Sequence, residues 1–140
     1  MLFQAAITIP KNTTKANPEK VTLKLAHGII TKFMVRPRPG HAALGHCVIY
    51  HFSHQIAPSA ENMDFHGDTF PIDWEDYYEF YQEPYELRLE GWNEDDTYPH
   101  TFDVFVAILP RKAIIALAIV DAIKGILGML SPKRIFTGRS

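Results

Sequence analysis

The stretch PYELRLEGWNEDDTYPHTFDVFVAILP, residues 84–110, decides the fold class of this chain. In its first half, apolar residues at positions 85, 87 and 89 alternate with charged residues at 86, 88 and 90. In its second half, the apolar residues at 102, 104, 106 and 108 share one face. A period of two is that of a half-buried strand, and the turn-forming residues NEDDT lie between the two halves. The stretch therefore predicts two antiparallel strands joined by a tight turn.

Strand-like segments also precede this hairpin. Residues 2–10, 20–27 and 29–37 are rich in β-branched and alternating apolar residues, and HCVIYHFSHQI, residues 46–56, predicts one central strand. The aromatic and acidic segment 73–81 predicts an edge strand with its charges pointing outward. Several short strands without an intervening helix predict a mainly β fold, an antiparallel β-sandwich of the jelly-roll or Ig-like type.

We expect one β-sandwich domain at residues 1–109, followed by a C-terminal helical tail at 110–140 that serves assembly or anchoring. A chain of 140 residues with 46% hydrophobic content can build one real core. Lys and Arg number 14 against 16 Asp and Glu, so no broad basic field favours a phosphate backbone. We therefore expect no nucleic-acid partner.

The tail contains RKAIIALAIVDAIKGILGMLSPKR, residues 111–134, the most apolar stretch of the chain. Pro110 suits a first helical turn and SPKR suits a helix end, which predicts one helix over residues 110–130. At 100° per residue, Asp121 and Lys124 lie on one narrow stripe, and apolar side chains cover most of the remaining surface. The candidate interface residues are Ile115, Ile119, Ile123, Ile126, Leu127 and Leu130.

Three environments can cover such a helix: neighbouring subunits, a membrane, or the chain's own sheet. A spanning helix needs roughly 20 apolar residues, whereas residues 113–130 include two charges and two glycines. A sandwich fills its interior with its own side chains, so a helix lying outside it would leave one apolar face in water. We therefore expect protein subunits to cover the helix, with membrane association through residues 111–134 as an alternative.

Catalytic and metal chemistry find little support in the residue spacing. The seven histidines show no compact zinc-type spacing. Ser53, His54 and Asp64 include triad residue types, but no nucleophile-elbow pattern accompanies them. We expect no enzyme activity, no catalytic residue, no metal site and no cofactor.

A second hypothesis is a carbohydrate- or receptor-binding module. Residues 57–69 form a long polar loop, and loops of this length are often functional. An exposed ring of Trp74 or Trp92 could stack on a sugar, and His54 and Gln55 come just after the apolar segment CVIYHF. These four are the candidate ligand-binding residues, although aromatic residues among alternating acids are more often core or interface material.

Three segments carry a resemblance to known proteins: IPKNTTKANPEKVTLKLAHGIITKFMV, HFSHQIAPS and YELRLEGWNEDDTYPHTFDVFV. They resemble uncharacterised small β-sandwich proteins of phage, archaeal-virus and metagenomic origin, over about residues 5–108. In that pattern a strand ends in a Gly-His-Gln or His-Gln turn, and a later hairpin reads close to PYELxxxGWNxDDxYPHT. This chain has Ser53 where glycine is expected before His54. The resemblance carries no activity and implies a particle component.

These observations predict a structural protein of a virion or similar large assembly, such as a capsid, decoration or tail-associated subunit. Its partners would be copies of itself or other structural subunits, with glycan or membrane contact as the alternatives. Its location would be the virion or another extracellular particle, after assembly in the host cytoplasm.

Overall fold

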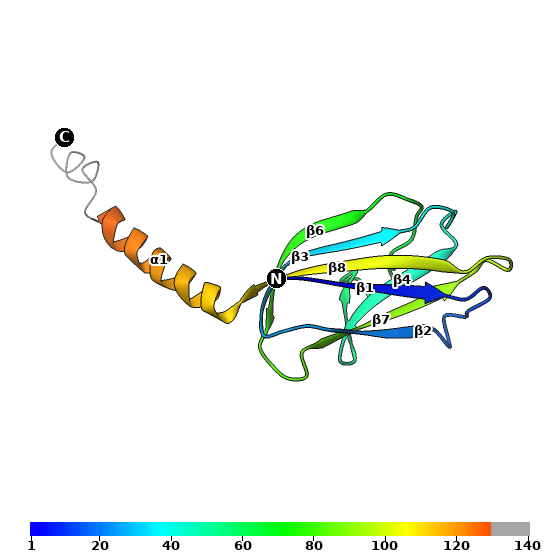
Figure 1. The fold of residues 1–140 in the computed structure, drawn as a ribbon, viewed down its shortest axis with the longest axis horizontal. Helices are drawn as coiled ribbons and strands as arrows, with labels where there is room; N and C mark the ends of the chain where they lie inside the picture. The colour runs from blue at the N-terminus through cyan, green and yellow to red at the C-terminus, as the bar shows by residue number, and fades with distance from the viewer. Residues whose placement is uncertain (130–140) are drawn as a thin grey trace.

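The computed structural model describes residues 1–129, which form a two-layer β-sandwich with one helix projecting from it (Figure 1). Both layers are antiparallel sheets of four strands. In chain order the elements are β1 (Leu2–Ile9), β2 (Glu19–Lys24), β3 (Gly28–Pro37), β4 (Gly45–His51), β5 (His54–Ala57), β6 (Ile72–Phe80), β7 (Glu86–Asn93), β8 (His100–Pro110) and α1 (Arg111–Met129).

The strand order identifies the sandwich as a jelly roll. One sheet has the order β1-β8-β3-β6 and the other β2-β7-β4-β5. The hydrogen-bonded pairs therefore include first with last, second with seventh, third with sixth and fourth with fifth, which is a long hairpin rolled into two sheets. The predicted mainly β sandwich is confirmed, and its topology agrees with the jelly-roll alternative.

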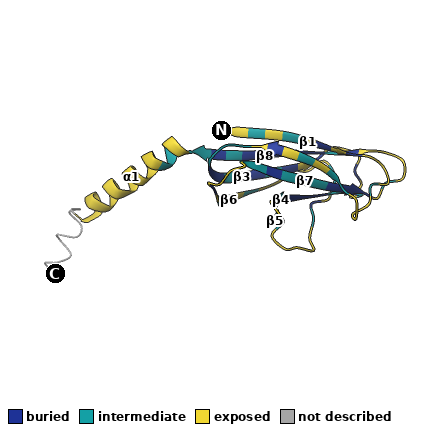
Figure 2. Ribbon diagram, turned by 90° about the horizontal axis from the view of Figure 1, so that it is seen from below, coloured by how far each residue is buried: buried dark blue, intermediate teal, exposed yellow. Residues whose placement is uncertain are grey.

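The prediction that residues 84–110 form a hairpin is wrong, because β7 and β8 lie in different sheets and the turn between them crosses from one sheet to the other. The core lies between the two sheets, and the alternating apolar positions of β7 and β8 contribute to it. Phe102, Val104 and Val106 on β8 are fully buried, and Leu87 and Leu89 on β7 lie opposite them. Figure 2 shows this burial as dark bands along the strands. The period of two read from residues 84–110 is thus the period of the core face.

The prediction of one central strand over residues 46–56 is wrong. β4 ends at His51, the chain reverses at Phe52 and Ser53, and β5 begins at His54, which pairs with His51. Phe52 takes a positive φ of 55°, in the left-handed region. Most two-residue hairpin turns are marked by Asn-Gly or Asp-Gly, so a turn built on Phe-Ser looks like continuous strand in the sequence.

The prediction for residues 73–81 is confirmed, because β6 lies at the edge of its sheet beside β3. Its charged residues are exposed, while Phe80 is buried and Trp74 is half-buried. The long loop between β5 and β6 also contributes to the fold. Its residue Phe65 forms an isolated antiparallel bridge with Cys47 of β4 and joins the core.

The predicted helix is present from Arg111, directly after β8, to Met129, while Leu130 lies outside the described residues. Figures 1 and 2 show it pointing away from the sandwich. It touches β3 and β8, and none of its residues from 111 to 129 is buried. The chain's own sheet therefore leaves this helix uncovered.

Candidate functional site

The most prominent surface feature is the apolar side of α1. Ile119 is 56% exposed, Ile126 59% and Leu127 61%, and Figure 2 shows the helix exposed along nearly its whole length. Ile115 and Ile123 are also exposed. Leu130, the sixth candidate interface residue, lies outside the described residues. Five of the six candidates thus lie on a helix that no other part of residues 1–129 buries.

The geometry of α1 explains how these side chains form one surface. Ile115, Ile119, Ile123 and Ile126 follow the i, i+4, i+8, i+11 spacing of one helix face. With 19 residues, the helix is about 28 Å long at a rise of 1.5 Å per residue. The apolar face is long enough to cross a small neighbouring domain.

The outer face of the sheet containing β1 and β8 carries a second apolar surface. Leu2 lies opposite Ala107, and Met34 lies opposite Phe105, in the strand register. These four residues and Lys32 line a hollow of about 250 Å³, which we call the sheet hollow. The sequence signal for it was the apolar character of Phe105 and Ala107, which stand at outward-facing positions of β8. The alternation at positions 102, 104, 106 and 108 indicates only the inward face of β8 and does not reveal the hollow.

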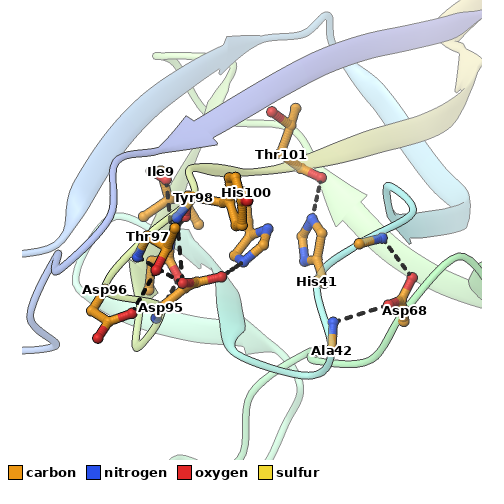
Figure 3. Close-up of polar contacts among 12 residues, drawn as sticks. Ile9, His41, Ala42, Asp68, Asp95, Asp96, Thr97, Tyr98, His100 and Thr101 are labelled. Carbon is orange, nitrogen blue, oxygen red and sulfur yellow. Dashed lines mark hydrogen bonds and ion pairs between the residues drawn. The ribbon is translucent and has the colours of Figure 1, made fainter.

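The turn between β7 and β8 is held by a network of polar contacts in which Asn93 and His100 are buried and Asp95 is half-buried (Figure 3). The Asp95 carboxylate accepts hydrogen bonds from the backbone N–H of Thr97 at 2.8 Å and from Nε2 of His100 at 2.8 Å. The Thr97 hydrogen bond is the main reason why the pKa of Asp95 is lowered. Asn93 is buried and donates to the carbonyls of Ile9 and Tyr98. The motif residues NEDDTYPH are therefore engaged in shaping the turn.

His41 stands beside this network, and its ring lies 4.6 Å from that of His100 (Figure 3). Its Nε2–H donates to the Thr101 carbonyl at 2.8 Å, so its buried Nδ1 is the nitrogen without a proton, and it has no partner within residues 1–129. Burial lowers the pKa of His41, and the neighbouring His100 adds to this effect. Gly45 leaves the needed space, because a Cβ there would lie 2.9 Å from Nδ1 of His41.

Of the four candidate ligand-binding residues, Gln55 and Trp92 line one hollow, whereas Trp74 lines another. The Trp74 ring stacks on the rings of Phe33 and Phe65, with 5.0 and 5.3 Å between ring centroids. Trp92 is buried and stacks on the His46 ring. Trp74 also lines a hollow of about 220 Å³ beside Pro58. The ligand-binding role of both rings stays a prediction.

Of the other two candidates, His54 is exposed and Gln55 is buried. Nε2 of Gln55 donates to the carbonyls of Pro58, Ala60 and Met63 at 2.8, 3.2 and 3.0 Å. The amide thus holds the start of the long loop against β5.

The structure gathers one group of side chains that the sequence spacing did not connect. His46, Asp64 and His66 place their ligand-type atoms within 4.8 Å of one another. The available signal was the Asp-x-His spacing in the loop, since residues two apart point the same way in an extended segment.

The part of the chain from residue 1 to 129 has no helix with both the length and the apolar character that crossing a membrane requires.

No protein-family model and no curated protein matches this sequence. Among solved structures, a chain of the cyanophage Pam1 capsid asymmetric unit is similar, with a TM-score of 0.52 and 11% identity over 79% of this chain and 84% of that chain. The Yersinia pseudotuberculosis-derived mitogen is similar with a TM-score of 0.44 and 10% identity, over 78% and 86% of the two chains. At 11% identity the first similarity concerns the fold alone. The expected likeness to phage proteins is thus confirmed at the level of fold, without support from a sequence family.

Proposed function

We propose that this chain is a structural subunit of a virion or a similar large particle and that α1 binds it to neighbouring copies. The observation that carries the proposal is the exposure of α1: a 19-residue helix rich in isoleucine, none of whose residues 111–129 is buried. Exposed apolar surfaces of this size mark sites of association. We therefore propose that a neighbouring protein subunit covers the apolar face of α1.

The energy available from covering α1 is large enough for stable association. A standard interface buries about 800 Å² per partner, which at about 25 cal/mol/Å² corresponds to about 20 kcal/mol before association costs. Those costs are of the order of 4–15 kcal/mol. Repetition over many copies adds avidity to each contact.

The sheet hollow supports a second copy of the same chain as the partner. Its lining of Leu2, Met34, Phe105 and Ala107 is apolar apart from Lys32, and α1 of the same chain points away from the sandwich (Figure 1). Each copy therefore has an apolar helix, α1, and the apolar sheet hollow, on different surfaces. Such a pair makes a head-to-tail contact, which generates rings or extended arrays.

The fold adds support for the particle. Jelly rolls form viral capsid domains as well as lectin domains and cupins, and one similar structure is a chain of a cyanophage capsid asymmetric unit. A jelly roll that also carries an exposed association helix is well suited to a shell or its decoration.

The test is the mass of the untagged full-length chain in solution, measured by sedimentation velocity over a range of concentrations. We expect species larger than the 16.0 kDa chain. Ile123→Lys, in the apolar face, should shift the distribution toward the monomer. The matched control is Leu117→Lys, because Ile123 and Leu117 are both 50% exposed and Leu117 lies on the stripe of Asp121 and Lys124. This control should associate nearly as well as the unmodified chain.

A mixing experiment tests the head-to-tail contact itself. Phe105→Glu places a charge in the sheet hollow and should also reduce association. Mixing this variant with Ile123→Lys should restore pairs, since one copy still has its helix and the other its hollow. A full-length chain that stays monomeric at every concentration contradicts the proposal. Flotation of the chain with liposomes, without self-association in their absence, contradicts it in favour of a lipid partner.

A further inference from the structure

Three polar side chains converge at one point of the surface formed by β4 and the long loop after β5. Nδ1 of His46 lies 2.7 Å from Oδ1 of Asp64, and Nδ1 of His66 lies 2.9 Å from the same oxygen. All three ligand-type atoms lie within 4.8 Å of one another. Two imidazole nitrogens and a carboxylate oxygen are the donor set of many zinc sites.

The fold fixes this arrangement through Phe65. Its backbone exchanges two hydrogen bonds with Cys47 of β4, at 3.0 and 2.8 Å, and its ring is buried in the core. Because side chains alternate along extended backbone, Asp64 and His66 on either side of Phe65 turn to the opposite face. His46, next to the inward-facing Cys47, turns to that face as well. The convergence therefore follows from the strand register.

His46 faces two carboxylates, which either an imidazolium with two N–H donors or a neutral ring with a metal ion on one nitrogen can satisfy. Its Nδ1 faces Asp64, and its Nε2 lies 3.1 Å from Oε2 of Glu94. A neutral imidazole has only one N–H, so it can donate to only one of these two carboxylates. With the proton on Nε2 and donated to Glu94, the Nδ1 lone pair faces a carboxylate oxygen at 2.7 Å, and a metal ion that draws the two atoms apart to its own bond lengths would bind both. The carboxylate–histidine–metal arrangement is the usual outer layer of zinc sites.

The surroundings hold His46 in place and leave one side of the group open. The His46 ring stacks on Trp92 with 5.3 Å between centroids and an interplanar angle of 7°. The side chains of His46 and Asp64 are only 14% and 18% exposed, whereas that of His66 is 51% exposed. The exposed side of the group, at His66, is open to an ion from solvent. Ligand atoms of tetrahedral zinc lie about 3.3 Å apart, so Nδ1 of His46 and Nδ1 of His66, now 2.7 and 2.9 Å from Oδ1 of Asp64, would each move away from it by about half an ångström.

We propose that His46, Asp64 and His66 form a binding site for a divalent transition-metal ion, with zinc as the expected ion and Glu94 orienting His46. Nitrogen and oxygen donors together favour zinc over calcium or magnesium, which prefer oxygen alone. Three protein ligands leave a fourth position for water or for a ligand from another molecule. The site is independent of α1 and of the proposed assembly.

The first test titrates zinc chloride into the untagged full-length chain at neutral pH by calorimetry. We expect saturable binding of one ion per chain. His66→Ala should weaken binding at least tenfold, and Glu94→Gln should weaken it tenfold to a hundredfold as expected for a group that orients a ligand. His54→Ala is the matched control, because it removes an exposed histidine outside the group and should leave the affinity unchanged.

The second measurement locates the ion and keeps the test valid if a variant folds poorly. Zinc should shift the ring ¹⁵N resonances of Nδ1 in His46 and His66 of the unmodified chain, while those of His54 stay in place. The absence of saturable zinc binding contradicts the proposal. Equal affinities of His66→Ala and the unmodified chain, or zinc-induced shifts at other histidines only, contradict it as well.

Discussion

The rings of His41 and His100 lie 4.6 Å apart, tilted by 37°, at the end of the sandwich where β8 begins. Both side chains are buried, His41 at 1% and His100 at 5% exposure. The two rings hydrogen-bond to different partners: Nε2 of His41 donates to the Thr101 carbonyl, and Nε2 of His100 donates to the Asp95 carboxylate. Protonation of His41 would place an unsolvated charge beside a second imidazole.

The first prediction is that the protein loses stability at moderately acidic pH through His41. Burial lowers the pKa of His41 below its ordinary value of 6.5, so the unfolded chain takes up a proton before the folded chain does. The stabilisation is present above about pH 6.5 and is lost as the pH falls through the lowered pKa. The nearby carboxylates of Asp68 and Asp95 take up protons only at lower pH, because their pKa values are lowered from the ordinary value of 3.8.

Urea unfolding at about pH 7.5 and about pH 5 measures this effect. His41→Gln, which keeps an N–H donor but does not titrate, should show a smaller loss of unfolding free energy between the two conditions. His54→Gln, at an exposed position, serves as the control. A loss in His41→Gln as large as in the unmodified chain would show that other groups cause it.

A second prediction concerns Asn93 in the β7–β8 turn. Asn93→Ala removes donors to Ile9 and Tyr98 and the acceptor for the N–H of Asp95. Leaving such buried groups without partners costs about 1–3 kcal/mol of unfolding free energy. Asp96→Ala, an exposed position in the same turn, should change it by less than about 0.5 kcal/mol. Equal effects of the two substitutions in chemical denaturation would argue against the turn network as a source of stability.

A third prediction separates a structural role of Gln55 from a ligand-binding role. Gln55→Leu removes the amide that contacts Pro58, Ala60 and Met63. Backbone amides of residues 58–65 should then exchange with deuterium faster, whereas His54→Ala should leave their exchange unchanged. Unaltered exchange in Gln55→Leu would show that the loop is held by other contacts.

A fourth prediction concerns the thiol of Cys47, which is fully buried. Burial, with a smaller contribution from the charge of Asp64, raises its pKa to about 12. The thiolate is the reactive form, so the folded chain should react with Ellman's reagent on the order of a thousandfold more slowly than the chain unfolded in guanidinium. Rapid reaction of the folded chain would contradict the burial of Cys47.

Much of the fold could be predicted from local pattern. The alternation around Leu87 and Leu89 and again from Phe102 to Ile108 marks the core faces of β7 and β8, because side-chain direction in a strand has a period of two. The reversal at Phe52 and Ser53 could not be predicted in this way. Its turn residues lack the usual signature, and the pairing of His51 with His54 depends on the neighbouring strands.

The sequence by itself determined the composition of the surfaces, and the tertiary structure decided which of them meet. The apolar character of α1 follows from the spacing of its isoleucines, which needs only helix geometry. Its exposure depends on the direction in which β8 leaves the sandwich. The meeting of His46 with Asp64 and His66 depends on the bridge between Cys47 and Phe65, 18 residues apart in the chain. Contacts between distant residues are set by strand register, which one local pattern does not specify.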